Sequence, residues 1–325
     1  MQVKDRVLEA LEANRGTYFS GEALAQKLAV SRSAVWKAIQ QLRESGYPIE
    51  AASKRGYCLA KDSAILSAQS IAQYLTVPQL RLEVEQLVSS TNTLLRQRAE
   101  AGESEGLALV AAAQTAGRGR RDHTFFSPPD TGLYLSFLVR PQLSAKDALL
   151  LTTCAAAAVA LAIEDCAGVP AEIKWVNDVF CRGKKVCGIL TEAALDLESG
   201  MLDYAVLGLG FNVAAPADGW PEDLRDVAGA LYDGSPAPGA RAALAAAFLN
   251  AFWPLYRAGP RSGYLDEYRR RQALAGQRVL VTPRRGTPRA AQVQGIDDEC
   301  KLVVRFDGES RPAALNSGEV SVRLL

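Results

Sequence analysis

Histidine is almost absent from this chain of 325 residues, in which His123 is the single example. A metal site built from several histidines, or a serine–histidine triad, would have to depend on that one residue. His123 stands in a polar, basic segment, so we interpret it as a loop residue at the surface. The composition therefore argues against enzymes that require a histidine cluster.

The cysteines show no pairing pattern. The six thiols are scattered through mostly apolar segments without any Cys-x-x-Cys spacing: Cys58, Cys154, Cys166, Cys181, Cys187 and Cys300. Single thiols of this kind fit a reducing compartment. We therefore expect a cytoplasmic protein.

Long hydrophobic runs are also missing. The longest apolar stretch, residues 148–162, is interrupted by Thr152 and Thr153 and is shorter than a membrane span. Residues 1–16 are charged and amphipathic, which is unlike a signal peptide. These features predict a soluble protein without a membrane partner.

The net charge is small, because 37 lysines and arginines face 36 acidic residues. A role in nucleic-acid binding would therefore need a local basic patch. The chain length predicts two or three domains. Changes in the apolar pattern place them at residues 1–62, 67–272 and 276–325.

Residues 1–62 carry a basic patch of this kind. Apolar residues recur at helical spacing in three segments, and Ser20 and Ser31 are suited to cap the second and third. Two short strand-like segments follow, at 47–50 and 56–59. Three helices followed by a hairpin predict a winged helix-turn-helix.

The third predicted helix is the candidate recognition helix, because its first turns would meet the bases and phosphates of DNA. The candidate DNA-binding residues lie there and at the hairpin tip: Ser31, Arg32, Ser33, Trp36, Lys37, Lys54 and Arg55. An alternative interpretation is a small helical bundle for protein contacts, with Trp36 in its core.

The rest of the chain shows two patterns of predicted secondary structure. Together with the N-terminal unit they predict an α+β multidomain protein. From 67 to 272 strands and helices alternate, which predicts a mixed α/β domain of catalytic size. Expected strands are 82–88, 106–113, 132–139, 171–175, 185–192 and 203–209, and expected helices are 92–101, 147–166, 240–256 and 263–272. Short strands at 278–282, 290–296, 302–306, 311–315 and 319–324 then predict a small β-barrel.

The most informative segment follows the apolar run 107–113 and reads Gln114-Thr-Ala-Gly-Arg-Gly-Arg-Arg121. Gly117 and Gly119 permit a tight turn whose amides are open to a ligand. Three arginines add donors suited to phosphate or carboxylate. A Walker A sequence is absent. Alone, the segment fits an anion-binding loop and a solvated basic turn equally well.

Three further segments place polar groups at predicted strand ends. They are 174–178 (Lys-Trp-Val-Asn-Asp), 184–190 (Lys-Lys-Val-Cys-Gly-Ile-Leu) and 208–213 (Gly-Leu-Gly-Phe-Asn-Val). Each is weak alone: Asp178 suits a turn cap, Lys184 and Lys185 suit a hairpin tip, and the third lacks the glycine pattern of dinucleotide binding. Their combination with the arginine loop points to one ligand cleft.

The order of these motifs resembles biotin–protein ligases, in the bifunctional form that also represses the biotin operon. The resemblance rests on 90–92 (Ser-Thr-Asn), 114–121, 126–128 (Phe-Ser-Pro), 174–178, 185–190, Glu192, 208–213 and 318–321 (Gly-Glu-Val-Ser). It is weakest over 214–239. It implies a winged helix-turn-helix, a catalytic domain of the biotin/lipoate ligase type and an SH3-like barrel.

The resemblance also implies the reaction. Biotin and ATP, with Mg²⁺, would form biotinyl-AMP and pyrophosphate. Biotin would then pass to one lysine of the biotin carboxyl carrier protein of acetyl-CoA carboxylase. The other implied partners are operator DNA of biotin genes and a second copy of the chain when the adenylate is bound. No enzyme nucleophile is required, because the mixed anhydride is itself activated.

The implied roles divide the candidate residues into three sets. The catalytic set is Lys185, Arg118, Arg120 and Asp178. The biotin-binding set is Ser90, Thr91, Asn92, Gln114, Gly117, Arg118, Arg120, Lys185, Cys187, Gly188 and Leu190. The nucleotide-binding set is Arg120, Arg121, Phe125, Lys174, Asn177, Asp178, Lys185 and Asn212. The metal ligands are unknown.

Two departures from the family pattern affect the nucleotide side. Val176 replaces the proline of a Lys-Trp-Pro-Asn-Asp motif, which removes a fixed φ. Residues 122–125 (Asp-His-Thr-Phe) replace a stretch that often carries glycine and tryptophan. Val176 keeps open the alternative of a biotin- or biotinyl-AMP-sensing repressor with weak ligase activity. A lipoate- or octanoyl-transferring enzyme of the same superfamily is a second alternative, against which the arginine loop and the winged helix argue.

Overall fold

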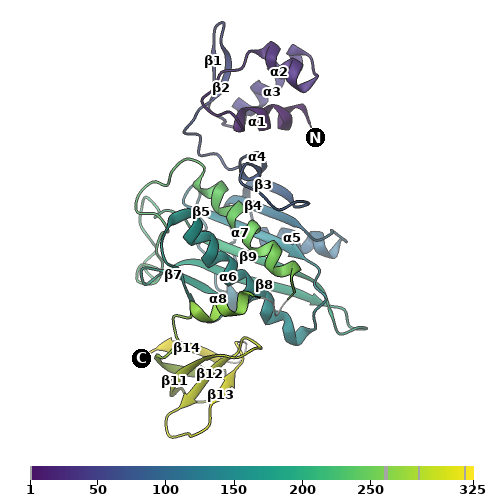
Figure 1. Ribbon diagram of the computed structural model, residues 1–325. Coiled ribbons are helices and arrows are strands. Elements are labelled where there is room, and N and C mark those ends of the chain that lie inside the picture. The colour runs from purple at the N-terminus through teal and green to yellow at the C-terminus, as the bar shows by residue number, and fades with distance from the viewer. Residues whose placement is uncertain (1, 260–262, 285, 318–319) are drawn as a thin grey trace.

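A computed structural model describes residues 2–259, 263–284, 286–317 and 320–325. Figure 1 shows three parts that follow one another along the chain: a helical unit with a hairpin, a large sheet covered by helices, and a small sheet at the C-terminus. The predicted divisions near 62–67 and 272–276 fall in the connections between these parts. As exact boundaries they stay predictions.

The N-terminal unit is a winged helix-turn-helix. It consists of α1 (Val3–Glu12), α2 (Gly21–Leu28), α3 (Arg32–Glu44) and the antiparallel strands β1 (Ile49–Ala52) and β2 (Gly56–Leu59). Ser20 and Ser31 cap α2 and α3, because their hydroxyls accept from the amides of Ala23 and Ala34. The alternative with Trp36 in a helical core is wrong, since Trp36 is 56% exposed.

The central sheet has seven strands. They are β3 (Arg81–Val88), β4 (Leu107–Gln114), β5 (Gly132–Val139), β6 (Glu172–Lys174), β7 (Asp178–Cys181), β8 (Lys184–Leu195) and β9 (Leu202–Asn212). Their order is β3-β4-β5-β9-β8-β7-β6. Only the pair β3–β4 is parallel, with α5 (Thr91–Glu100) as its crossover. The predicted strands are therefore confirmed, and β7 is an addition.

Helices cover both faces of this sheet. The long helices α6 (Ala148–Ala167) and α7 (Ala240–Arg257) pack on one face, while α5 packs on the other (Figure 1). The remaining helices are α4 (Ala68–Ala72), α8 (Tyr264–Arg270) and the 3₁₀ turns η1 (Arg120–Asp122) and η2 (Ala145–Asp147). The face covered by α5 is the one that carries the site described below.

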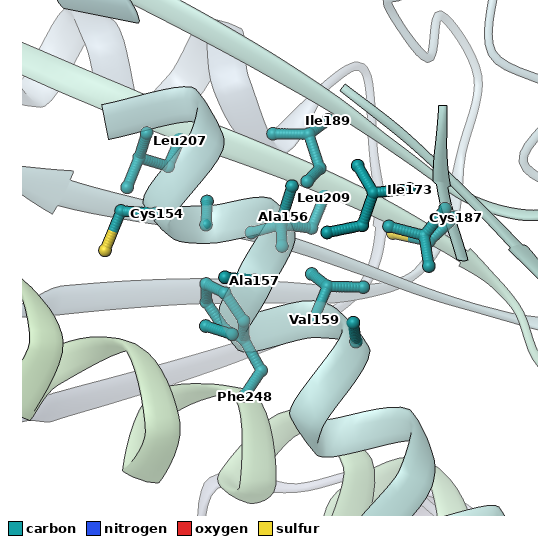
Figure 2. Close-up of a cluster of buried hydrophobic side chains, with 14 of the residues drawn as sticks. Cys154, Ala156, Ala157, Val159, Ile173, Cys187, Ile189, Leu207, Leu209 and Phe248 are labelled. Atoms are coloured by element: carbon teal, nitrogen blue, oxygen red, sulfur yellow. The ribbon is translucent and has the colours of Figure 1, made fainter. Parts of the chain in front are cut away.

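Helix α6 is apolar on nearly all sides. Ala155 to Ala158 are fully buried, and their small side chains let the helix lie close to Ile189, Leu207 and Leu209 of the sheet and to Phe248 of α7 (Figure 2). By length and composition this helix would pass for a membrane span, but 72% of its apolar window is buried inside the protein. It is accordingly a core helix.

The C-terminal part is a five-stranded antiparallel sheet in the order β13-β12-β11-β10-β14. Its strands are β10 (Arg278–Pro283), β11 (Arg289–Ile296), β12 (Leu302–Phe306), β13 (Ala313–Leu315) and β14 (Val320–Leu324). The five predicted strands are thus present, although Gly318 and Glu319 lie outside the described residues. Closure into an SH3-like barrel stays a prediction.

Candidate active site

A cavity of about 640 Å³ opens on the α5 side of the central sheet and reaches the C-terminal sheet. The polar residues that the sequence analysis selected as candidates for ligand binding line this cavity. Its lining includes Ser90, Thr91, Asn92, Gln114, Arg118, Arg120, Arg121, Phe125, Lys174, Asn177, Asp178, Lys185, Gly188, Leu190 and Asn212. All but two of the candidate biotin- and nucleotide-binding residues therefore meet in one place. The two exceptions are Gly117 and Cys187.

Gly117 shapes the arginine loop without lining the cavity. A Cβ atom at this position would lie 2.4 Å from both Phe125 O and Ser127 Oγ, so no larger residue fits. The carbonyl of Gly117 also accepts a hydrogen bond from Phe125 N at 2.9 Å. At the base of the loop, Thr115 N donates to Val88 O at 2.9 Å. The loop is thereby fastened to the end of β3.

The three arginines of the loop point to three different partners. Arg118 Nη1 lies 2.9 Å from Glu192 Oε1. Arg120 Nη1 donates to Asn177 Oδ1 at 2.7 Å, and its Nη2 donates to Ser317 O. Arg121 Nη2 donates to Val320 O at 2.7 Å. Burial lowers the pKa of the Arg120 guanidinium, which remains a cation at neutral pH. Each of the three arginines thus has a polar partner, although Arg118 and Arg121 are exposed and only Arg120 is partly buried.

Another part of the cavity wall is polar and neutral. Gln114 Oε1 accepts from Thr91 N at 2.9 Å and from Thr91 Oγ1 at 3.2 Å, and Gln114 Nε2 donates to Ser127 Oγ. Ser90 caps α5 through Thr93 N. Paired donors and acceptors of this kind suit a neutral polar ring.

Lys185 is a further charged group in the lining of the cavity. Its Nζ is 2.7 Å from Asp178 Oδ1, and both side chains are about three-quarters covered. Asn177 Nδ2 donates to Ile189 O, which fixes the turn before β7. Asn212 Nδ2 donates to Lys185 O at 3.2 Å. Asp178 is therefore an ion-pair partner of Lys185 and not simply a turn cap.

The predicted biotin contact of Cys187 is wrong. Side chains alternate across a strand, and in β8 Gly188 and Leu190 face the cavity while Cys187 faces the core under α6 (Figure 2). Cys187 is fully buried, and burial raises the pKa of its thiol well above the usual value. It is a core residue.

Phe125 forms part of the cavity floor. Its ring packs edge-on against Tyr134 with centroids 6.4 Å apart. A Cβ at Gly210 would lie 2.4 Å from this ring, and one at Gly188 would lie 3.2 Å from it. The two glycines in neighbouring strands therefore make room for the aromatic side chain.

Sequence reasoning missed the wall formed by residues 214–239. Trp220, Asp223, Leu224, Val227 and Ala228 line the cavity. Lys185 N donates to Val227 O at 2.8 Å, which attaches this segment to β8. Trp220 also packs edge-on against Phe126. The one usable signal was a tryptophan inside an otherwise polar, aperiodic stretch.

The candidate DNA-binding residues are all exposed on the N-terminal unit. Arg32, Ser33, Trp36 and Lys37 are exposed on the first turns of α3, as is the capping residue Ser31. Lys54 and Arg55 are exposed in the β1–β2 turn, where the Arg55 guanidinium lies 3.8 Å from the Tyr18 ring centroid. The helix and the wing thus both present cations to solvent.

Comparisons with known proteins identify the family. Residues 84–212 match the Biotin/lipoate A/B protein ligase family, and residues 4–58 match an HTH domain family. The chain is 34% identical over 253 residues to the "Bifunctional ligase/repressor BirA" of Bacillus spizizenii, covering 77% of each protein. It is 35% identical over 208 residues to the protein of the same name from Escherichia coli, covering 64% of this chain and 63% of that one.

A solved structure is similar over most of the chain. The biotin protein ligase from Aquifex aeolicus in complex with biotin and ATP is 26% identical, with a TM-score of 0.62, and the match covers 75% of this chain and 99% of that one. The fold and both sequence families agree. The chain therefore belongs to the family of bifunctional biotin–protein ligases and repressors.

Proposed function

We propose that this protein joins biotin to ATP and transfers the biotinyl group to a lysine of the biotin carboxyl carrier protein of acetyl-CoA carboxylase. One observation carries this proposal: a single cavity holds the arginine loop, the Lys185–Asp178 pair and the neutral polar end at Thr91 and Gln114. A ligand with a neutral polar ring at one end and a carboxylate at the other matches this arrangement.

In the first step, a carboxylate oxygen of biotin attacks the α-phosphorus of ATP, and pyrophosphate leaves. The two reactants are anions, so their repulsion forms a large part of the barrier, and fixed cations lower it. Arg118, Arg120 and Lys185 supply those cations at the cavity wall. We assign Lys185 to the position between the carboxylate and the α-phosphate.

Recognition of biotin falls to the neutral end. Ser90, Thr91, Asn92 and Gln114 hydrogen-bond the ureido ring, and Gly188 and Leu190 face the apolar remainder. Arg121, Phe125, Lys174, Asn177, Asp178 and Asn212 form the nucleotide side. The Mg²⁺ ion enters with ATP as part of the substrate.

In the second step, the amine of the acceptor lysine attacks the carbonyl carbon of biotinyl-AMP, and AMP leaves. Asp178 has three conceivable roles: orienting Lys185, meeting the metal of ATP, or accepting a proton from the acceptor lysine. Its 2.7 Å contact with Lys185 Nζ supports the first. The reaction needs no enzyme nucleophile.

The winged helix adds a regulatory role. We propose that the exposed cations of α3 and the wing bind operator DNA of biotin genes, and that adenylate binding promotes a homodimer whose two recognition helices meet a palindromic site. The free thiols support a cytoplasmic location.

The test is incubation of the full chain with ATP, biotin and a purified carrier domain. We expect a mass increase of one biotinyl group on one lysine of the carrier domain. A matched reaction with lipoate or octanoate tests the transferase alternative. Tight binding of biotin without pyrophosphate release would instead favour a sensing repressor with weak ligase activity.

A further inference from the structure

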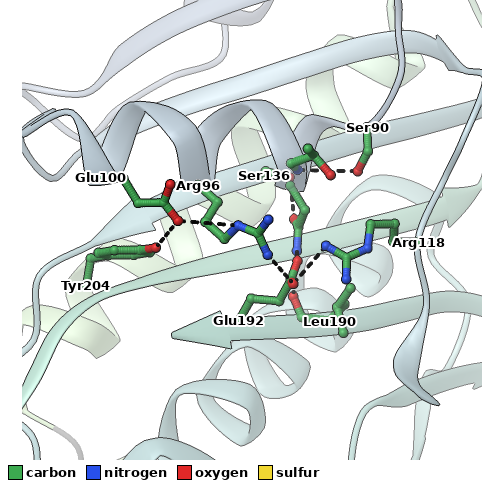
Figure 3. Close-up of polar contacts among 10 residues, drawn as sticks. Ser90, Arg96, Glu100, Arg118, Ser136, Leu190, Glu192 and Tyr204 are labelled. Carbon is green, nitrogen blue, oxygen red and sulfur yellow. Dashed lines mark hydrogen bonds and ion pairs between the residues drawn. The ribbon is translucent and has the colours of Figure 1, made fainter. Parts of the chain in front are cut away.

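Glu192 lies on β8 two residues beyond Leu190 and contacts Arg118 and Arg96 (Figure 3). Oε1 accepts from Arg118 Nη1 at 2.9 Å and lies 3.5 Å from Arg96 Nη1. Oε2 accepts from Asn92 Nδ2 at 3.0 Å. The side chain is only 17% exposed, so its charge is poorly screened by water.

The contact with Asn92 continues into the neutral end of the cavity. Asn92 Nδ2 also donates to Leu190 O, and Asn92 Oδ1 accepts from Ser136 Oγ at 2.6 Å. Ser136 Oγ is 2.8 Å from Thr91 Oγ1, which in turn contacts Gln114 Oε1. A chain of hydrogen bonds thus runs from the carboxylate to the proposed ring-binding groups.

This chain of hydrogen bonds is tightly packed. Asn92 is 4% exposed and Ser136 is fully buried. A Cβ at Gly208 would lie 2.1 Å from Asn92 Oδ1, so the sheet leaves the amide little freedom to move. Because an ionised carboxylate only accepts hydrogen bonds, it fixes which end of the Asn92 amide faces it.

The ion pair between Glu192 and Arg118 involves the arginine proposed to bind the ligand carboxylate. Arg118 is 38% exposed and stands on a glycine-flanked loop, so its long side chain would otherwise sample many rotamers. The contact with Glu192 uses Nη1 of Arg118, whereas a guanidinium has five N–H donors. Glu192 therefore holds one edge of Arg118 and leaves other donors for a ligand carboxylate.

We propose that Glu192 is a positioning residue that sets Arg118 and Asn92 together, and so fixes the distance between the carboxylate-binding and ring-binding ends of the biotin site. This inference rests on the proposed function. It also gives a specificity rule: the ligand must span both ends at once, so Glu192 affects affinity for biotin more than affinity for ATP.

The decisive variant is Glu192→Gln in the full-length protein, because it keeps the size of the side chain. Its amide oxygen can accept from one partner, but its NH₂ group then faces the other donor, and the charge is lost. We expect the KM for biotin in pyrophosphate exchange to rise about tenfold, since charge-assisted hydrogen bonds are lost. The KM for ATP and the melting temperature should change little.

Two matched variants separate positioning from general damage. Arg96→Ala removes the more distant partner of Glu192, which also pairs with Glu100, and should leave the KM for biotin within about twofold. Combining Glu192→Gln with Arg118→Ala should cost less than the product of the two single effects, because the first acts partly through the second.

The outcomes are distinct. An unchanged or lower KM for biotin in Glu192→Gln overturns the inference, as does a large fall in melting temperature with normal KM in the folded fraction. An effect on the KM for ATP equal to that for biotin overturns it too. If the unsubstituted protein itself shows no biotin-dependent exchange, the proposed function fails, which is a separate result.

Discussion

The ion pair between Lys185 and Asp178 is the central feature at the scale of single residues. Its Nζ–Oδ1 distance is 2.7 Å, and each side chain remains between a quarter and a third exposed. Such a pair adds little to stability, since solvent screens it. Its value is positional, because it keeps an ammonium group where two anions are proposed to meet.

Replacing Lys185 by alanine should lower the rate of biotinyl-AMP formation by roughly a hundredfold or more, because a preorganised cation opposite the developing charge is lost. The measurement is biotin-dependent pyrophosphate exchange. Lys185→Arg keeps the charge and should recover part of the rate. An exchange rate in Lys185→Ala close to that of the unsubstituted protein would remove Lys185 from the mechanism.

Arg120→Ala should weaken binding of biotinyl-AMP about tenfold to a hundredfold, because a buried charge-assisted contact to phosphate is lost. Arg120 also holds Asn177 and Ser317, so the cavity edge between the two sheets loosens as well. Calorimetric titration with the adenylate measures this effect. Arg121→Ala, whose partner is Val320 O, should have a smaller effect. Equal affinities in all three proteins would contradict the assignment.

At the scale of elements, helix α3 has two distinct faces. Val35, Ala38, Ile39 and Leu42 are buried against α1 and α2, while Trp36 and its neighbouring cations are exposed. A purely structural helix gains nothing from an exposed tryptophan between Arg32 and Lys37. Its exposure between two cations fits the proposed surface for phosphates and base edges.

The double variant Arg32→Ala with Lys37→Ala should weaken binding to a biotin-operon promoter and reduce its salt dependence. Each lost phosphate contact lowers the slope of log K against log salt by about 0.9. Gel shifts at several salt concentrations, in the presence of biotin and ATP, test this. Lys4→Ala is the control, because it also removes a positive charge but lies on α1, outside the proposed contact surface. A salt slope that stays the same would show that α3 does not contact phosphate.

The predictability of the elements follows from their periodicity. The strands and helices with a clear period of apolar residues were predicted to within a few residues. The gathering of polar strand-end residues in one cavity was also predicted. In 186–190 the run Val-Cys-Gly-Ile-Leu is apolar without alternation, so the pattern assigned no face to Cys187, and the family resemblance placed it at the biotin site although it lies in the core. Strand β7 is only four residues long, and the wall at 214–239 is held by tertiary contacts, so neither left a periodic signal.

At the scale of the whole molecule, arginine side chains form hydrogen bonds at both connections of the central domain, to the winged helix and to the C-terminal sheet. Arg15 Nη1 donates to Ser63 O, and Arg241 Nη2 donates to Ala64 O, which fastens the connection after the winged helix. At the other end, Arg120 and Arg121 bond carbonyls of Ser317 and Val320. The cavity therefore borders both the central and the C-terminal sheet.

Arg271 joins the end of α8 to the central domain. Its side chain is 4% exposed and bonds Glu164 at the end of α6 and Glu267 on α8, while its carbonyl accepts from Ile173 N of β6 at 2.7 Å. The hydrogen bond from Arg271 lowers the pKa of Glu164 below its ordinary value. An acid whose pKa is lower in the folded state stabilises the fold above its unfolded pKa and loses that contribution as the pH falls through the folded value.

Glu164→Gln should therefore lower the free energy of unfolding at pH 7 by roughly 1 kcal/mol, a figure already reduced because Glu164 is about one-third exposed to screening solvent. The deficit should shrink as the pH falls below the ordinary pKa of a glutamate and vanish once Glu164 is protonated in both states. Urea unfolding at a series of pH values measures it, with Glu172→Gln, an exposed acid of β6, as control. A deficit independent of pH would mean that the residue acts through packing, and that charge does not join these parts of the molecule.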